Sequence, residues 1–338
     1  MIDYRSDTFT KPTPAMLEAM FKAEVGDDVF QEDATVNKLE ALSAEMFGME
    51  AAIFCPSGTM TNQIAIKCHT QPGDEVICES LSHIYIYEGG GIAFNSSAST
   101  RPINGDCGRI TAEQVAEAIN PDDINKPHST LVSLENTANR GGGSCYNFSE
   151  LEKIKEVCIA NKLALHLDGA RLFNALVAKN EKPEEYGRVF DSISICLSKG
   201  LGTPVGSVLL GKKDFIYKAR RVRKVMGGGM RQAGYLAAAG IYAIENHIDR
   251  LANDHSHASM LADVLATKDF VKQVTPVETN ILIFEVSGRF TPQGLVDILM
   301  TEHEIKCFAI SKTQVRMVLH LDITTEMVNK TIEVLQKL

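Results

Sequence analysis

From residue 51 to residue 211 the chain alternates short apolar runs with segments of helical periodicity, and this alternation limits the possible folds more than any other feature. Helical segments such as TAEQVAEAI and FSELEKIKEVCIANK carry apolar residues at helical spacing. The apolar runs have the length of buried strands and are AAIFC (51–55), DEVICES (74–80), STLVSLEN (129–136), LALHLDGARL (163–172), DSISICLSK (191–199) and GSVLLG (206–211). Strands that alternate with helices form βαβ units, so we predict an α/β fold with a large, mostly parallel sheet and helices on both faces.

The length of 338 residues favours more than one domain. Residues 1–33 have no regular periodicity, and we expect them to form an N-terminal segment that contributes to the active site. Residues 34–245 form the predicted large domain. A long helical stretch over 235–267 leads into a smaller C-terminal α/β domain, which we place at residues 246–338.

Charge and composition exclude several classes of partner. The formal net charge of -9 argues against nucleic acid or an anionic membrane. No apolar run approaches the roughly 20 residues of a membrane span, and the charged start MIDYRSDTFTKP lacks the apolar stretch of a signal peptide. The eight cysteines form no C-x-x-C pair, so we expect reduced thiols and a cytoplasmic location. His255 and His257 point to different faces of a helix, and we predict no metal site.

Two charged residues follow neighbouring strands of the predicted sheet. Asp168 comes at the end of LALHLDGARL, and Lys199 follows SICLS 31 residues later. Because consecutive parallel strands end at the same edge of a sheet, and ligands collect at that edge, the two side chains are expected to face one site. The alternative for Asp168 alone is a helix N-cap. A lysine rarely lies at a buried strand end without a partner, so Lys199 favours the functional interpretation.

A turn between a strand and a helix, CPSGTMTN, carries Ser57, Gly58 and Thr59. Free backbone N–H groups and the positive end of the helix make such a turn a candidate anion site. Ser198, beside Lys199, adds a hydroxyl to the same anion if the two turns meet. Many turns of this composition bind nothing, so this signal alone is weak.

His83 follows DEVICES, again at the carboxyl end of a predicted strand. A flat ring at this position can stack on a planar cofactor, whereas a lone histidine is more often a structural residue. Glu88, which precedes three glycines, is interpreted as a solvated charge.

Two basic elements remain outside the sheet. RRVRKVMGGGMRQ (220–232) contains Lys224 and Arg231, and reads either as the end of a surface helix or as a loop that reaches an anion in a neighbouring subunit. Arg316 lies within the apolar strand QVRMVLHL, where it needs a carboxylate partner, either an internal one or that of a substrate.

Together these residues are the equipment of a pyridoxal phosphate enzyme: a lysine for the covalent link, an aspartate for the ring nitrogen, a helix end for phosphate and an arginine for a carboxylate. A dinucleotide site fits less well, because no G-x-G-x-x-G follows the first strand.

The chain resembles the low-specificity L-threonine aldolases, pyridoxal phosphate enzymes of fold type I. The resemblance covers nearly the whole length. Its blocks are RSDT, EVGDDVF, AAIFCPSGTMTN, SLENT, LHLDGARLFNA, SICLSKGLGTPVGS, GGGMRQAG and LAAAGIYA. It implies that Lys199 holds the cofactor, that Asp168 bonds the pyridinium nitrogen and that His83 stacks on the ring.

The resemblance also implies roles for residues outside this trio. The phosphate would be bound by Gly58, Thr59 and Ser198. Lys224 and Arg231 would approach it from a neighbouring subunit, in a homotetramer built as a dimer of dimers with shared sites. The substrate carboxylate would be bound by Ser6, Arg171 and Arg316.

The sequence departs from the family pattern at the end of the site that faces the β-hydroxyl group. Phe30 and Gln31 stand where members usually have Tyr-Gly, and Asn125 takes the place of a histidine that faces the substrate. Ala138 likewise stands where histidine is common.

The resemblance therefore implies retro-aldol cleavage of L-threonine, L-allo-threonine and related 3-hydroxy amino acids to glycine and an aldehyde. His83 is the candidate base. The alternatives are a β-eliminating lyase on the same fold, a cofactor-binding homologue without turnover and a nicotinamide oxidoreductase.

Overall fold

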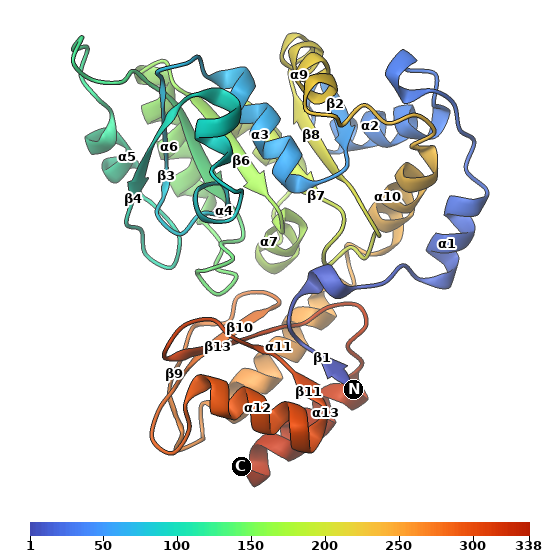
Figure 1. Cartoon of the computed structure of the whole chain (residues 1–338), viewed down its shortest axis with the longest axis vertical. Helices are drawn as coiled ribbons and strands as arrows, with labels where there is room; N and C mark the ends of the chain where they lie inside the picture. Colours follow the sequence, from blue (N-terminus) through green and yellow to red (C-terminus); the bar gives the residue numbers. More distant parts are fainter.

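The computed structural model describes the whole chain, residues 1–338, as a larger α/β part and a smaller C-terminal part (Figure 1). The larger part contains a seven-stranded sheet. In spatial order its strands are β2 (Ala51–Cys55), β8 (Ser207–Gly211), β7 (Ser192–Cys196), β6 (Ala164–Gly169), β5 (Ser129–Glu135), β3 (Glu75–Glu79) and β4 (Ser99–Ile103). Only β8 runs antiparallel to the rest of the sheet. The predicted α/β fold with a mostly parallel sheet is confirmed.

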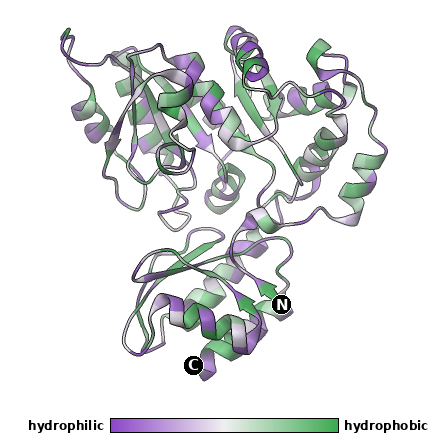
Figure 2. Cartoon of the chain, viewed as in Figure 1, coloured by the Kyte–Doolittle hydropathy of each residue, from purple (hydrophilic) through white to green (hydrophobic).

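The strands of this sheet are buried on both faces, which explains why they read as continuous apolar runs. Ala52 and Phe54 of β2 pack with the helices α2 (Ala34–Met46) and α10 (Gly234–Asn246). Ile53, between them, packs on the opposite face with α3 (Gly58–His69) and α9 (Lys213–Val225). Figure 2 shows the resulting hydrophobic colouring along β8 and α10.

The other helices of the larger part lie around this sheet, and all of them except α1 connect its strands. They are α1 (Pro14–Phe21), α4 (His83–Ile86), α5 (Ala112–Ala118), α6 (Phe148–Ala160), α7 (Leu172–Lys179) and α8 (Pro183–Val189), with short 3-10 or π turns η1 (Asp7–Phe9), η2 (Asp28–Phe30) and η3 (Ile92–Ser96). Several helices of the larger part, including α3 and α5, begin at a residue whose side-chain hydroxyl caps the helix. Ser57 Oγ accepts from the N–H of Met60 at the start of α3, and Thr111 forms a reciprocal capping box with Gln114 at the start of α5.

The C-terminal part has its own hydrophobic core, formed by a four-stranded antiparallel sheet and three helices. The strands, in spatial order, are β12 (Phe308–Ala309), β13 (Gln314–Val318), β10 (Ile281–Val286) and β9 (Val271–Val274), and the helices are α11 (Leu251–Leu265), α12 (Pro292–His303) and α13 (Thr325–Lys337). The N-terminal strand β1 (Ile2–Asp3) pairs with β11 (Ile305–Lys306) in this part before the chain crosses to α1, beside α10 (Figure 1). The predicted domain boundaries at residues 33 and 245 stay predictions.

The helical stretch predicted over 235–267 is two helices, because the chain turns between Asn246 and Leu251. His247 ends α10, and its Nδ1 lies 2.7 Å from the carbonyl oxygen of Leu201. This contact comes from a distant part of the chain, so no local glycine or proline marks the break. None of the helices is both long enough and apolar enough to cross a membrane. All eight cysteines are free and seven are buried, as expected for reduced thiols.

Candidate active site

Lys199 and Asp168 lie at the same edge of the large sheet, as the spacing of their strands predicts. β6 and β7 are parallel neighbours that pair Asp168 with Ser194, and Lys199 follows shortly after the end of β7. Asp168 is buried, whereas Lys199 is half-buried and forms no ion pair or side-chain hydrogen bond. The helix after β6 has Arg171 as its N-cap, so the N-cap interpretation of Asp168 is wrong.

His83 is the first residue of α4, at the same edge of the sheet. Its Nδ1 lies 3.0 Å from Oε1 of Glu88, and one nitrogen of its ring and one oxygen each of Glu88 and Asp168 lie within 4.8 Å of one another. Burial by itself lowers the pKa of His83. The hydrogen bond with Glu88 and the charge of Asp168 outweigh burial, so the pKa of His83 is raised above its usual value.

Glu135, at the end of β5, holds two loops of the site. Its Oε2 accepts from the backbone N–H of His83 at 2.7 Å, and its Oε1 accepts from the N–H of Asn139 at 2.8 Å. Burial, together with the charge of Asp168, raises the pKa of Glu135 to about 7. Because this one carboxylate binds both loops, the positions of His83 and Asn139 are linked.

The turn at the start of α3 lies beside the end of β7. A side chain at Gly58 would come within 4.0 Å of Cys196 and Ser207, and Ser198 Oγ is 3.6 Å from the sulfur of Cys196. The N–H groups of Gly58 and Thr59 have no acceptor within the chain. The two turns that were predicted to share an anion therefore meet, and the positive end of α3 faces their junction.

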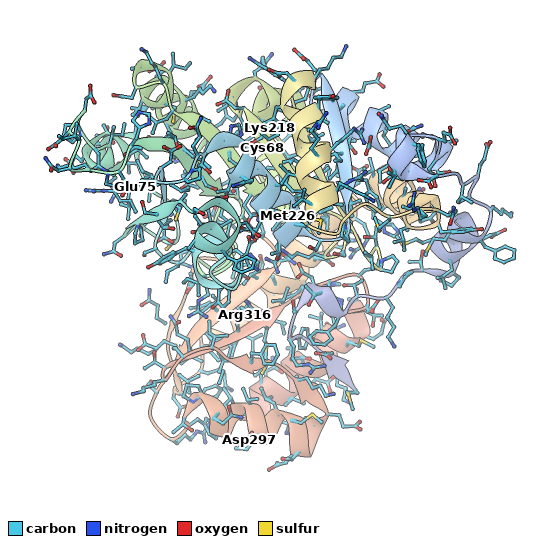
Figure 3. All side chains as sticks on the ribbon, turned by 45° about the horizontal axis from the view of Figure 1, so that its top comes forward. Cys68, Glu75, Lys218, Met226, Asp297 and Arg316 are labelled. Atoms are coloured by element: carbon cyan, nitrogen blue, oxygen red, sulfur yellow. The ribbon has the colours of Figure 1, made fainter.

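Arg171 and Arg316 converge from the two parts of the molecule on Oδ1 of Asn139, at 3.4 and 3.0 Å. Arg316 lies in the middle of β13, as predicted, and Figure 3 labels it where the C-terminal part meets the larger part. Its Nε is buried and has no acceptor. Burial and the neighbouring charge of Arg171 lower the pKa of Arg316 to about 10. Two guanidinium groups with spare donors form a suitable site for a carboxylate.

Ser6, which was predicted to bind the substrate carboxylate with these arginines, has a local role in the structure. It caps η1, where its Oγ accepts from the N–H and hydroxyl of Thr8. The following residue, Asp7, binds Arg171 through both carboxylate oxygens.

Four predicted residues have no hydrogen bond or ion pair with any of the site residues described above. These are Phe30, which is 68% exposed, Lys224, which is exposed on α9, Arg231, which pairs with Asp27 at 2.8 Å, and Asn125. Asn125 lies in an exposed loop and bonds to Asp123. That loop precedes β5, a strand about 20 Å long that runs toward Glu135, so Asn125 lies at the opposite edge of the sheet.

The sequence did not indicate several polar residues that complete the site. Glu88 was interpreted as a solvated charge, which is wrong, because its side chain is completely buried. Asn62, on α3, donates from Nδ2 to both Glu88 and Asp168 at 2.9 Å. The only available signal was position: Asn62 is one helical turn after Gly58 and Thr59.

The fold of this chain is that of the fold type I enzymes. A solved structure of aspartate aminotransferase from Rhizobium meliloti shares the fold with a TM-score of 0.73, at 14% identity and with coverage of 99% of this chain and 90% of that one. A structure of Leishmania major threonine aldolase has a TM-score of 0.85 at 22% identity, with coverage of 100% of this chain and 99% of that one.

Residues 3–288 match the Beta-eliminating lyase family. The chain is 44% identical to the low specificity L-threonine aldolase of Escherichia coli strain K12 over 96% of both chains. It is 40% identical to low-specificity L-threonine aldolase 1 of Arabidopsis thaliana, over 99% of this chain and 96% of that protein. The chain belongs to the family of low-specificity L-threonine aldolases. This confirms the resemblance that the sequence blocks indicated.

Proposed function

We propose that the protein cleaves L-threonine, L-allo-threonine and related 3-hydroxy amino acids to glycine and an aldehyde, with pyridoxal phosphate as cofactor. One observation carries the proposal: the unpaired Lys199 and the buried Asp168 lie at the ends of neighbouring parallel strands, with His83 beside them. Membership of the threonine aldolase family supports the same reaction.

The residues present fit the cofactor. Lys199 is a lysine without an ionic partner and would hold the cofactor covalently, while Asp168 would pair with its ring nitrogen and His83 would stack on its ring. The free N–H groups at the start of α3, with Ser198 beside them, would bind its phosphate. When bound, pyridoxal phosphate supplies an electron sink for the electron pair released from the Cα–Cβ bond.

The chain itself contributes binding, orientation and proton transfer. Arg171 and Arg316 bind the substrate carboxylate, each charged hydrogen bond contributing roughly 1.5–3 kcal/mol. With that end fixed, His83 takes the proton of the β-hydroxyl group. The Cα–Cβ bond breaks, the β-oxygen becomes the aldehyde carbonyl, and Cα takes a proton to give glycine.

A direct assay tests this proposal. The purified protein is given L-threonine, L-allo-threonine, their D-forms and phenylserine, and glycine is measured. Glycine from the L-forms is expected, together with loss of activity in Lys199→Ala and a borohydride-reducible adduct at Lys199. Activity restricted to the D-forms contradicts the proposed stereochemistry.

A second reaction, β-elimination, is favoured by the match to the Beta-eliminating lyase family. It uses the same cofactor residues but releases ammonia and a 2-oxo acid, which is 2-oxobutyrate when the substrate is threonine, so these products in place of glycine identify it. A borohydride-reducible protein that gives neither set of products is the remaining alternative, a homologue without turnover.

We further propose a homotetramer of dimers with shared sites, located in the cytoplasm. Exposed apolar side chains support an interface on the side of α9, where Val225 is 88% and Phe94 87% exposed beside a groove of about 690 Å³. Lys224, on the same helix, is exposed and has no ion pair in its own chain. Light scattering gives the assembly and cell fractionation gives the location.

A further inference from the structure

Glu88 is a buried carboxylate that the reaction as described does not use. Its side chain has no exposed surface, and its two oxygens accept hydrogen bonds from three side chains. Oε1 is 3.0 Å from Nδ1 of His83 and 2.9 Å from Nδ2 of Asn62, and Oε2 is 2.6 Å from Nε2 of Gln63. Donors on both oxygens stabilise the ionised form of a buried carboxylate.

Three glycines follow this carboxylate in the sequence EGGG and form the turn that brings it to His83. Gly89 and Gly90 have φ angles of +63° and +73°, a region that favours glycine, so the chain reverses directly after Glu88. Gly91 has no room for a side chain, because a Cβ there would lie 2.6 Å from the side chain of Gln63. The same glutamine holds Oε2 of Glu88. Gly91 therefore packs the turn against α3.

The buried carboxylates determine which atom donates and which accepts in each hydrogen bond of the surrounding network. Asn62 donates both hydrogens of Nδ2, one to Glu88 and one to Asp168, so its Oδ1 must accept. The donor is Nε2 of His166, at 3.1 Å, whose Nδ1 then accepts from Ser192 Oγ at 2.8 Å. Glu88 and Asp168 are thus joined in one buried hydrogen-bond network through Asn62.

An ionised carboxylate only accepts hydrogen bonds, so Nδ1 of His83 must carry the proton in its contact with Glu88. In the neutral ring, Nε2 is then the nitrogen with a free lone pair. We propose that Glu88 is a positioning residue, whose carboxylate orients the ring of His83 and presents Nε2 as the proton acceptor for the β-hydroxyl group. This inference rests on the proposed function.

Glu88 also contributes to the pKa of His83, through its hydrogen bond and its charge. Burial lowers the pKa of His83, the hydrogen bond with Glu88 raises it, and the net shift is upward. The other titratable groups that face the ring are Asp168, Glu135, Lys199 and Tyr87. Removing the charge of Glu88 therefore lowers the pKa of His83, whereas a purely structural contact leaves that pKa in place.

The decisive variant is Glu88→Gln, which keeps an acceptor oxygen but no charge. In the loaded enzyme, the acid limb of the kcat/KM pH profile is expected to move down by about one pH unit. NMR titration of protein labelled with ¹⁵N-histidine, with the His83 signal assigned by His83→Asn, is expected to show the same shift. At the high-pH plateau, kcat/KM is expected to fall about tenfold or more as base strength and orientation are lost.

Glu79→Gln is the matched control. Glu79 is also buried at the end of β3 and accepts from backbone N–H groups, but it has no hydrogen bond with His83. The Glu79→Gln change is expected to leave the pKa of His83 unchanged. An unshifted acid limb in Glu88→Gln overturns the proposal, even if kcat falls.

The NMR measurement separates this inference from the proposed function. If the wild-type protein releases no glycine, the proposed function fails, whereas a His83 pKa that is unchanged in Glu88→Gln refutes the pairing itself. If Glu88→Gln does not fold, the ¹⁵N shifts of wild-type His83 still show which ring nitrogen carries the proton. A neutral ring protonated on Nε2 overturns the inference, and one protonated on Nδ1 supports it.

Discussion

Asp7 binds Arg171 with both oxygens of its carboxylate, at 2.7 Å from Nε and 2.7 Å from Nη2, and both side chains are buried. Burial by itself would raise the pKa of Asp7, but the charge and hydrogen bonds of Arg171, with the charge of Lys199, lower it to about 2. The ion pair joins the N-terminal segment to the start of α7. It fixes the guanidinium that we assign to the substrate carboxylate.

Replacing Asp7 by asparagine is expected to lower the free energy of unfolding by about 3 kcal/mol, because it leaves the charge of Arg171 buried without its counterion. The KM for the amino acid should rise as well, since Arg171 loses its fixed orientation. Urea denaturation and steady-state kinetics measure the two effects.

Asp3→Asn is the control for this variant. Asp3 pairs with Arg5 at 2.6 Å, but about a quarter of each side chain is exposed (27% and 28%). A partly exposed pair contributes about 1 kcal/mol or less, so this change should cost little. Equal losses in the two variants would contradict a special role of the buried pair.

Lys224 offers a test of the shared site. Lys199→Ala and Lys224→Ala are each expected to be inactive or strongly impaired as pure proteins. If Lys224 serves the site of a neighbouring subunit, exchange of subunits between the two variants restores about a quarter of wild-type activity, because half of the dimers are mixed and each holds one complete site. Glycine release after mixing measures this. A mixture no more active than its components would place Lys224 outside the partner's site.

The edge of the sheet at which the site lies could be predicted from the sequence because it depends on strand order. Asp168 and Lys199 follow consecutive strand patterns, and the parallel pairing of β6 with β7 places them together without further information. Lys199 could be predicted as a site residue because a charge at a buried strand end is costly unless it has a partner or a function.

The carboxylates that position these residues were not predictable, because most of their hydrogen-bond partners are distant in sequence. Asp7 meets Arg171 from 164 residues away, and Glu88 meets Asp168 only through Asn62 of α3. A glutamate before a glycine turn usually lies at the surface, and nothing local distinguishes Glu88 from such a residue. The break after α10 was missed for the same reason, since His247 is held by Leu201.

Acid sensitivity is expected from a half-buried histidine at the far end of α3. His69 stacks on Phe215 with ring centroids 4.6 Å apart, and burial lowers its pKa to about 4. In the unfolded chain its pKa is about 6.5, so between these values the unfolded state binds more protons and stability falls as the pH falls. From about pH 7 to about pH 5 this group costs up to about 2 kcal/mol.

His69→Gln should therefore flatten the decline of unfolding free energy over that range, measured by urea denaturation at a series of pH values. His128→Gln is the matched control, since the side chain of His128 is 82% exposed. A decline that is equally steep in His69→Gln and in the wild type would show that other groups cause the acid sensitivity.

The last prediction concerns Gln31, which stands where family members usually have glycine. Gln31 has a φ angle of +60°, a left-handed conformation that costs a residue with a side chain about 1–2 kcal/mol. Its backbone oxygen accepts from Asn37, a bond that glycine retains. Gln31→Gly is therefore expected to raise the free energy of unfolding by up to about 1 kcal/mol, after the entropy that glycine adds to the unfolded chain. Thermal and urea unfolding measure the gain. Gln31→Ala keeps the unfavourable Cβ and should give no such gain, so equal stabilisation by both changes would show that the glutamine side chain, and not the backbone angle, is the source of strain.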